Sequence, residues 1–469
     1  MTTELQGQIR RGIAWVGLAS GAVGALDAIT NVIVLWLWVS PAELGVATMA
    51  SALFPILDRL ATLGLGSAAV RAPDDRRTLS SIAWLALASA LVVCGGLVAL
   101  ARPLGALFDR PVVGLLLAAY GGKLLLQTAH LIPEALLRRD LAFRSLSLVR
   151  MIAMIADSTA KLAAAALGLH VWCFVIGPLA SAVVTLVGIQ RVRPWWPALQ
   201  LDVRAARVAA RFGIQVSVGE LLYFVYTSMD YVVIGRVFGD AAVGAYRLAY
   251  ELVLDVVRLV SMVTGEVAFA AFAKLADRAA VAAQLVRMTR QNLLVIAPLL
   301  VVIGVAADDL LAVLYPPLGG AAATAARILC VVGALRAMSF VLPPMLAGLG
   351  HARDGLVYNA VAAVLLPLAF ATGAQLGDSY LAVAWAWAAA YPLAFALVLW
   401  FALRRAELGL GSYLRGLARV AGCAAGALAA ALGARVLLPT EPILRALGTG
   451  LAAGAVYVLL VRLSGASRR

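Results

Sequence analysis

The sequence predicts an all-α polytopic membrane protein with about fourteen transmembrane helices. Of its 469 residues, 63% are hydrophobic and only 13% are charged. The mean hydropathy is +0.96, and apolar stretches of roughly 20 residues, the length that crosses a bilayer as a helix, recur along the whole chain. A soluble protein of this length would carry far more polar surface, so composition argues against a soluble fold.

The first six expected helices make up an amino-terminal lobe, residues 1–195. Residues 1–11 are polar and no small-residue cleavage site closely follows the first apolar run, so we expect that run to be kept as a helix and not removed as a signal peptide. The six apolar stretches cover residues 12–38, 43–66, 79–101, 111–133, 145–168 and 170–190.

A cytoplasmic linker, residues 196–211, is expected to lead into a second six-helix lobe, residues 212–405. Trp195 and Trp196 stand where the linker begins, a position typical of the membrane interface, and a basic stretch follows them. The remaining apolar stretches are 212–236, 243–268, 291–314, 324–348, 355–376 and 379–403, and then two additional helices, 417–438 and 443–463, within residues 406–469.

A weak internal repeat supports the division into two lobes. Aligning Asn31 with Asp230 also brings Gly45 onto Gly244 and Arg59 onto Arg258. An even number of expected helices separates the matched segments, so the two lobes would insert in the same direction. Transport proteins built from such halves bind their substrate between them.

The net charge of +14 follows the loops between the apolar stretches. Alternate loops carry arginine pairs such as Arg76 with Arg77 and Arg138 with Arg139, whereas the intervening loops hold few basic residues. The positive-inside rule then places both termini in the cytoplasm of a bacterial inner membrane. Because the basic residues form no single face, we expect no nucleic-acid partner.

The eighth apolar stretch carries Arg247, Glu251, Asp255 and Arg258, at spacings that put all four on one helical face. Such a face must look into protein or water and not into lipid. One interpretation is the lining of a cavity; the alternative is a set of intrahelical ion pairs that only hold the helix in place.

The fifth apolar stretch contains Arg150, Asp157 and Lys161. Asp157 and Lys161 are four residues apart, so an ordinary ion pair along the helix is an equally good interpretation. Arg150 is also consistent with a boundary residue whose head group reaches the interface.

Carboxylates stand at comparable places in the two lobes, Asp27 with Asn31 in the first stretch and Glu220 with Asp230 in the seventh. Such groups can hold Na⁺ or exchange a proton, although hydrogen bonds that join neighbouring helices are the competing interpretation. The candidate ion-coupling residues are Asp27, Asn31, Asp157, Glu220, Asp230, Glu251 and Asp255.

Intramembrane cations point to an anionic substrate. A charged side chain at the bilayer centre costs about 2.5–3.5 kcal/mol on insertion scales, so it usually lines a watery cavity. Arginine presents a planar fork of donors that suits phosphate. The candidate substrate-binding residues are Lys123, Arg150, Lys161, Arg247, Arg258 and Arg336. We expect His130 to be a packing residue, and Asp308 and Asp309 to be exposed near the outer boundary.

Several kinds of chemistry find no support in the sequence. The 4 cysteines and 3 histidines are scattered, which disfavours a disulfide framework and a metal site. No nucleotide-binding loop, kinase signature or nucleophile grouping is visible, so we expect no enzyme and no cofactor. Coupling to H⁺ or Na⁺, or the gradient of the substrate itself, would then supply the energy.

Four stretches carry a family resemblance: L-G-L-G-S-A-A-V-R at Leu63–Arg71, P-E-A-L-L-R-R-D-L-A-F-R at Pro133–Arg144, D-Y-V-V-I-G-R-V-F-G-D-A-A-V-G-A-Y at Asp230–Tyr246 and A-F-A-K-L at Ala271–Leu275. They resemble the polysaccharide-transport flippases of the multidrug/oligosaccharidyl-lipid/polysaccharide exporter superfamily. The third stretch is the most specific. The family often has a proline before the last stretch, where this chain has Ala270 and Ala271, so the usual cause of a kink there is missing.

The resemblance implies a two-lobed, V-shaped helical bundle similar to that of multidrug exporters. It implies translocation of an undecaprenyl-pyrophosphate-linked oligosaccharide, a repeat unit of capsule, exopolysaccharide or O-antigen, across the cytoplasmic membrane by alternating access. The cavity cations would take the pyrophosphate while the prenyl tail stays in membrane lipid. A polysaccharide polymerase and glycosyltransferases would be partners.

Three alternatives remain open from the sequence. A lipid II-type flippase also fits fourteen helices, and a cation-coupled multidrug-type small-molecule exporter would use Asp27, Glu220, Asp230 and Glu251. A membrane polymerase or ligase is disfavoured, because none of the expected outer loops exceeds about a dozen residues, too few for a folded catalytic module.

Overall fold

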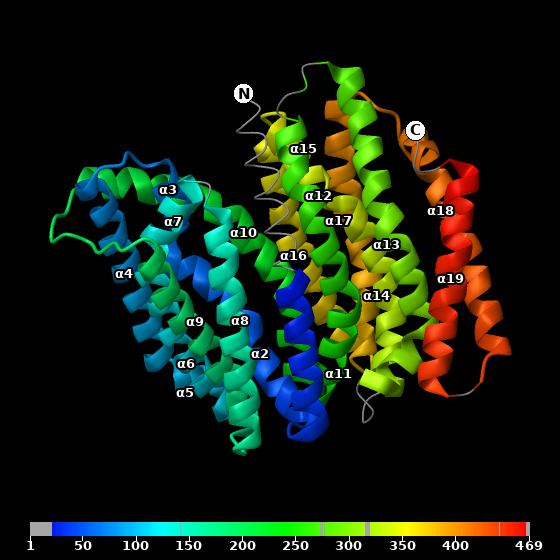
Figure 1. Ribbon diagram of the computed structural model, residues 1–469, viewed down its shortest axis with the longest axis horizontal. Helices are drawn as coiled ribbons and strands as arrows, with labels where there is room; N and C mark the ends of the chain where they lie inside the picture. Colours follow the sequence, from blue (N-terminus) through cyan, green and yellow to red (C-terminus); the bar gives the residue numbers. More distant parts are fainter. Residues whose placement is uncertain are drawn as a thin grey trace. The chain divides into compact units, whose positions relative to one another are not determined.

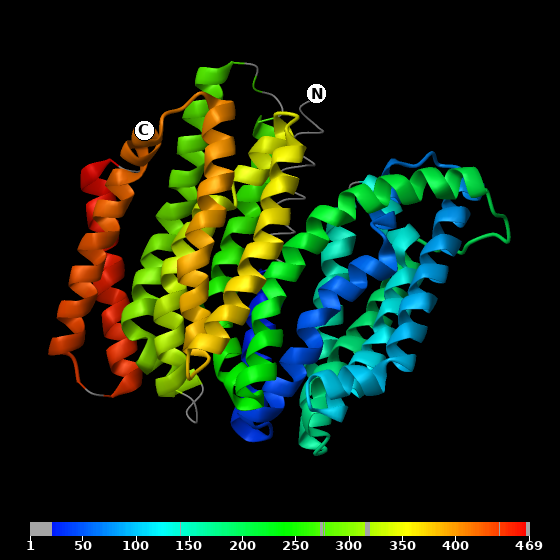
Figure 2. The same ribbon diagram turned by 180° about the vertical axis from the view of Figure 1, so that it is seen from behind.

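The computed structural model of the chain describes residues 21–140, 142–272, 275, 277–314, 319–439 and 441–465 (Figures 1 and 2). Every regular element in these residues is helical. The chain divides into two compact units, Met1–Gly244 and Ala245–Arg469. Part of the first expected helix, residues 12–20, lies outside the described residues.

The first unit begins, within the described residues, with a helix at Gly21–Leu37. The following helices are α2 Pro41–Thr62, α3 Leu65–Arg71, α4 Arg76–Ala99, α5 Ala101–Leu107, α6 Pro111–Ala129, α7 Leu131–Arg139, α8 Phe143–Ala166, a short turn at His170–Trp172, α9 Cys173–Val192 and α10 Val203–Phe238. Helix α11, Asp240–Tyr250, starts at the end of this unit.

Side chains just before several helices explain where those helices start. Ser40 and Glu43 form a capping box at α2, in which the Ser40 backbone N–H donates to Glu43 Oε2 at 2.7 Å. Asp75 caps α4 and Asp202 caps α10, where Asp202 Oδ1 accepts from the Ala205 N–H at 3.0 Å. These backbone hydrogen bonds lower the pKa of both aspartates.

Helix α10 is 36 residues long and packs on α2, α3 and α4. Its first part lies across the ends of α3 and α4, and the remainder runs beside α2 (Figures 1 and 2). The basic part of the expected linker, residues 196–211, is therefore helical from Val203 onward. The compact units divide after Gly244, and the lobe limits at 195, 211 and 405 stay a prediction.

The second unit continues α11 through a π-helical turn at Glu251–Asp255. The other helices are α12 Val256–Phe272, α13 Arg278–Leu314, α14 Gly319–Ser339, α15 Leu342–Gly348, α16 Ala352–Leu376, α17 Leu381–Ala406, α18 Leu410–Leu437 and α19 Pro442–Ser464.

Ion pairs fasten the two last helices, α18 and α19, to α13. Asp308 accepts from Arg435 of α18 at 2.6 Å and also pairs with Arg327 of α14. Asp309 accepts from Arg445 Nε of α19 at 2.8 Å. The expected exposure of Asp309 is wrong, because its side chain is only 1% exposed in this contact.

Eleven helices in the described part of the chain are long and apolar enough to cross a membrane. The predicted fold class, an all-α polytopic membrane protein, is confirmed. Three expected crossings are not among the eleven. The first is described only from Gly21, the fifth carries four charged residues within α8, and the eighth is divided among α11, the π turn and α12, none of which reaches 18 residues by itself. The number fourteen therefore stays a prediction.

Candidate functional site

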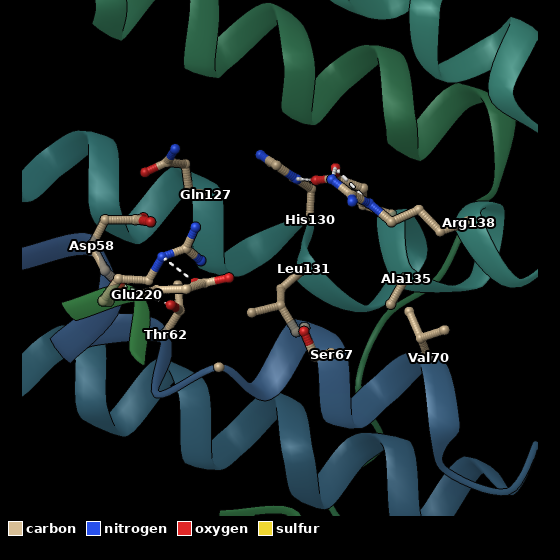
Figure 3. Close-up of a pocket in the computed structure, with 14 residues that line it drawn as sticks. Asp58, Thr62, Ser67, Val70, Gln127, His130, Leu131, Ala135, Arg138 and Glu220 are labelled. Atoms are coloured by element: carbon tan, nitrogen blue, oxygen red, sulfur yellow. Dashed lines mark hydrogen bonds and ion pairs between the residues drawn. The ribbon is translucent and has the colours of Figure 1, made fainter. Parts of the chain in front are cut away.

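The first unit contains two polar cavities that share part of their lining. The larger, about 390 Å³, lies among α2, α3, α6, α7 and α10 and is named here the α2–α7 cavity (Figure 3). The smaller, about 290 Å³, lies among α6, α7, α8 and α9 and is named the α6–α9 cavity. Gln127, His130 and Glu134 line both.

A tight turn after α2 shapes the larger cavity. Leu63 and Gly64 both have positive φ, at 48° and 64°, which reverses the chain into α3. A Cβ at position 64 would lie 2.4 Å from the Gly213 carbonyl oxygen of α10, so only glycine fits. Backbone geometry at the wall of the cavity thus explains the first glycine of the L-G-L-G stretch, Gly64.

Figure 3 shows Asp58, Gln127 and Glu220 at one end of the α2–α7 cavity. Arg59 Nε lies 2.9 Å from Glu220 Oε2, which ties α2 to α10. The Gln127 side-chain oxygen has no hydrogen-bond partner within the part of the chain that the structure describes. An unsatisfied buried acceptor of this kind calls for water or a ligand donor.

Glu134 occupies the other end and connects the two cavities. Its carboxylate lies 3.3 Å from His130 Nδ1, accepts from Arg138 Nη2 at 2.7 Å and lies 3.5 Å from Arg150 Nη2. Burial alone would raise the pKa of Glu134, but His130 and the Arg138 guanidinium hold it well below its usual range. Glu134 is therefore an anion that organises three basic side chains.

The α6–α9 cavity brings together two of the predicted substrate-binding cations, Lys123 and Arg150. Lys123 Nζ lies over the Phe54 ring, 4.3 Å from its centroid, and Arg150 is half exposed. The hydroxyl-bearing residues Ser181 and Thr185 line the same space. With Glu134 as the carboxylate in its lining, this cavity has an excess of positive charge that suits an anion.

Lys161 lies elsewhere in the first unit, in a cluster of predicted ion-coupling residues. Its ammonium is 3.0 Å from Asp27 Oδ1, 3.2 Å from Asn31 Oδ1 and 3.2 Å from Asp157 Oδ2. The pair along α8 therefore extends to a second helix. Asp230 is fully buried, and its Oδ1 accepts from the Tyr231 N–H at 2.9 Å.

The remaining predicted residues belong to the second unit. Arg247 Nε donates to Glu251 at 2.7 Å, and Arg258 Nε donates to Asp255 at 3.3 Å, so both arginines have carboxylates on their own helical segment. These are the contacts that the ion-pair interpretation expects. Arg336 is buried, donates to Tyr250 Oη at 3.0 Å and faces the Trp387 ring.

Sequence reasoning missed Asp58, Glu134 and Arg138 as lining residues. Asp58 lies inside its apolar stretch and was not singled out. Glu134 stands just beyond the end of its stretch, where solvent exposure is the simpler assumption, and Arg138 was assigned to a basic loop. A signal was present: His130, Glu134 and Arg138 recur every four residues, as on one helical face. His130, expected to be a packing residue, is buried and contacts Glu134.

Comparisons with known proteins give relatives along most of the chain. The succinoglycan biosynthesis transport protein ExoT of Rhizobium meliloti is 25% identical over 80% of this chain and 76% of its own length. The teichuronic acid biosynthesis protein TuaB of Bacillus subtilis is 24% identical over 75% of this chain and 74% of its own. The lipopolysaccharide biosynthesis protein WzxC of Escherichia coli is 22% identical, over 78% and 75%.

Solved structures share the fold. The lipid II flippase MurJ, in an inward closed conformation, superposes with a TM-score of 0.78 at 12% identity, covering 96% of this chain and 98% of its own. An inward-facing multidrug resistance MATE family transporter gives 0.63 at 16% identity, covering 83% and 98%. The profile of the polysaccharide biosynthesis protein family matches residues 37–317, more than half of the chain. The chain therefore belongs to the polysaccharide biosynthesis protein family.

Proposed function

We propose that this chain is a flippase that moves an undecaprenyl-pyrophosphate-linked oligosaccharide from the cytoplasmic to the periplasmic leaflet of the bacterial inner membrane. The cargo would be a repeat unit of capsule, exopolysaccharide or O-antigen, carried by alternating access. Membership of the polysaccharide biosynthesis protein family supports this function, as do relatives named for succinoglycan transport, lipopolysaccharide synthesis and teichuronic acid synthesis.

The observation that carries the proposal is the α6–α9 cavity, where Lys123 and Arg150 share one space with Ser181 and Thr185. A pyrophosphate needs several donors and compensating positive charge, and these side chains offer both. Glu134 Oε1 lies 3.5 Å from Nη2 of Arg150. A guanidinium has five N–H donors, so this contact leaves others that a ligand could use. Arg247, Arg258 and Arg336 are proposed as further substrate-binding cations, whereas the predicted contact of Lys161 with substrate stays a prediction, because its ammonium contacts Asp27, Asn31 and Asp157.

Transport against a gradient would need an energy source, and we propose coupling to H⁺ or Na⁺. The candidate groups are those predicted from the sequence: Asp27, Asn31, Asp157, Glu220, Asp230, Glu251 and Asp255. A polysaccharide polymerase would use the delivered repeat units, and glycosyltransferases would build them on the cytoplasmic side. Both termini are proposed to be cytoplasmic.

The test is complementation of a deletion strain with Lys123→Gln, Arg150→Gln and the double variant. Losing one charged hydrogen bond removes about 1.5–3 kcal/mol, so export of surface polysaccharide should fall roughly tenfold or more. Lipid-linked repeat units should accumulate. Arg102→Gln, at an exposed arginine of α5, is the matched control and should export normally.

Unchanged export by the double variant at normal abundance in the membrane would remove this assignment. A deletion strain that keeps its polysaccharide but accumulates cationic dyes would favour the multidrug-type exporter instead. Surface polysaccharide and dye uptake are therefore measured in the same strains.

A further inference from the structure

Lys161 sits in the first unit at a point where three side-chain oxygens from two helices converge. Asp27 and Asn31 come from the helix Gly21–Leu37, and Asp157 comes from α8 one turn before Lys161. The distances from Lys161 Nζ are 3.0, 3.2 and 3.2 Å. The side chains of Lys161 and Asp157 are 6% and 9% exposed, so protein replaces most of their hydration.

The oxygens form the donor set of a hard-cation site. Two carboxylates and one amide carbonyl are the ligand types that alkali and alkaline-earth cations prefer. The helices that carry them are held in place by apolar packing, because Val34 and Val39 are buried against Ala164, Ala165 and Cys173. The cluster is thus a built site and not a chance meeting of flexible side chains.

Close backbone packing closes the site on the side of α9. A Cβ at Gly177 would lie 3.0 Å from the Asp157 carbonyl oxygen and 3.1 Å from Lys161 Cβ. This approach leaves no room for Lys161 to turn toward α9. The flexible stem of a lysine ends in a compact ammonium with three donors, which matches three acceptors.

We propose that the Lys161 ammonium is a tethered substitute for a monovalent cation, so the Asp27–Asn31–Asp157 cluster is a cation site that the chain fills by itself. Wild-type protein would take up no Na⁺ or K⁺ there. Removing the amine would leave two carboxylates without their counter-charge and create a site for a small monovalent cation. The inference deepens the ion coupling of the proposed function, because it means that Asp27, Asn31 and Asp157 do not take up Na⁺ in the wild-type protein, and its test needs no measurement of export.

Purified Lys161→Ala protein tests this directly. Its thermal unfolding midpoint is measured in NaCl, KCl and methylammonium chloride, with N-methylglucamine chloride keeping the ionic strength constant. At least one small cation should raise the midpoint of Lys161→Ala in a saturable way, whereas the wild-type midpoint should be the same in all four salts.

Two controls locate the effect. Adding Asp27→Asn and Asp157→Asn to Lys161→Ala should abolish the cation-dependent rise, because the ligand charges are gone. Lys123→Ala, at another intramembrane lysine of this unit whose amine lies over a ring, should show no cation-dependent rise. Lys161→Gln provides a second variant, one atom shorter than lysine, that keeps an uncharged NH₂ donor group.

A midpoint of Lys161→Ala that is equal in all four salts would overturn the inference, as would a wild-type rise of the same size. If lower pH but no added cation raised the midpoint of Lys161→Ala, the cluster would be a proton-binding site and the inference of a cation site would be wrong. The inference would also be contradicted if neither Lys161→Ala nor Lys161→Gln could be purified in NaCl or KCl. An added cation should replace the missing ammonium and keep the variants folded. None of these measurements involves transport, so failure of the flippase proposal leaves the binding result interpretable.

Discussion

At the scale of single residues, Glu134 connects the two cavities, because its carboxylate contacts His130, Arg138 and Arg150. Its pKa is held below the usual range of a glutamate, so the folded protein binds its proton more weakly than the unfolded chain does. The carboxylate therefore stabilises the fold at neutral pH. That contribution is lost as the pH falls below roughly 4.3, the pKa of an unperturbed glutamate.

Glu134→Gln should lower the free energy of unfolding at pH 7 by about 1.5 kcal/mol, the low end for a charged hydrogen bond, because Arg138 and Arg150 are half exposed. The difference from wild type should shrink as the pH falls below roughly 4.3. Thermal unfolding of the purified protein between neutral and acidic pH measures it. Glu441→Gln, at an exposed glutamate, should follow the wild-type curve. An unchanged pH dependence in Glu134→Gln would contradict the role given to this carboxylate.

Hydropathy alone identifies two lysines as charges inside apolar stretches, and their predicted contact with substrate stays a prediction. Lys123 and Lys161 stand inside apolar stretches, and both have polar or aromatic surroundings in the structure. The partner of Lys161 could not be read from the same pattern. Helical spacing points to Asp157, but Asp27 is 134 residues away and meets Lys161 only through packing of two helices.

At the scale of elements, the π turn at Glu251–Asp255 changes the backbone hydrogen-bond pattern inside a run that is helical on both sides of it, from α11 to α12. Its Val253 side chain packs against α14, because a Cβ at Gly333 would lie 3.3 Å from Val253 Cγ1. Hydropathy carries no information about which carbonyl oxygen accepts from a given backbone N–H. The sequence pattern therefore predicted a continuous α-helix here, without the π turn. The turn carries two members of the charged stripe, Glu251 and Asp255.

The two glycines that the repeat aligns make reciprocal contacts at the start of α2 and α11. A Cβ at Gly45 would lie 1.8 Å from the Asp240 carbonyl oxygen, and one at Gly244 would lie 2.1 Å from the Pro41 carbonyl oxygen. Both obstacles are backbone atoms, which cannot rotate away. The coincidence noticed in the sequence therefore has a steric reason in the first unit.

Gly244→Ala should destabilise the protein by about 1–3 kcal/mol through overpacking, although alanine is the better helix former. Gly95→Ala is the matched control, because nothing lies within 4 Å of the added Cβ. That substitution should be neutral or stabilising by up to about 1 kcal/mol. The thermal unfolding midpoints of the two purified variants are compared with the wild-type midpoint. Equal midpoints for Gly244→Ala and Gly95→Ala would show that α2 and α11 can move apart without loss of stability.

At the scale of the whole molecule, the fold class was predictable because a bilayer leaves few alternatives. A backbone in hydrocarbon must satisfy its own hydrogen bonds, so apolar stretches of sufficient length become helices. The cavities were less predictable. Asp58 and Glu134 line one cavity only after α7 has packed on α3, and no periodicity in a single helix encodes that packing.

The positive-inside rule makes a prediction about the whole chain that labelling can check. Leu199 in the predicted cytoplasmic linker is 92% exposed, and Asp378 in a predicted periplasmic turn is also exposed. In a variant without the 4 native cysteines, Asp378→Cys should react with a membrane-impermeant maleimide on intact spheroplasts. Leu199→Cys should react only after the membrane is opened, because the arginines around it hold that loop on the cytoplasmic side. The reverse pattern would contradict the predicted topology. The α6–α9 cavity, which lies beside that linker, would then be on the wrong side of the membrane to receive a cytoplasmic substrate.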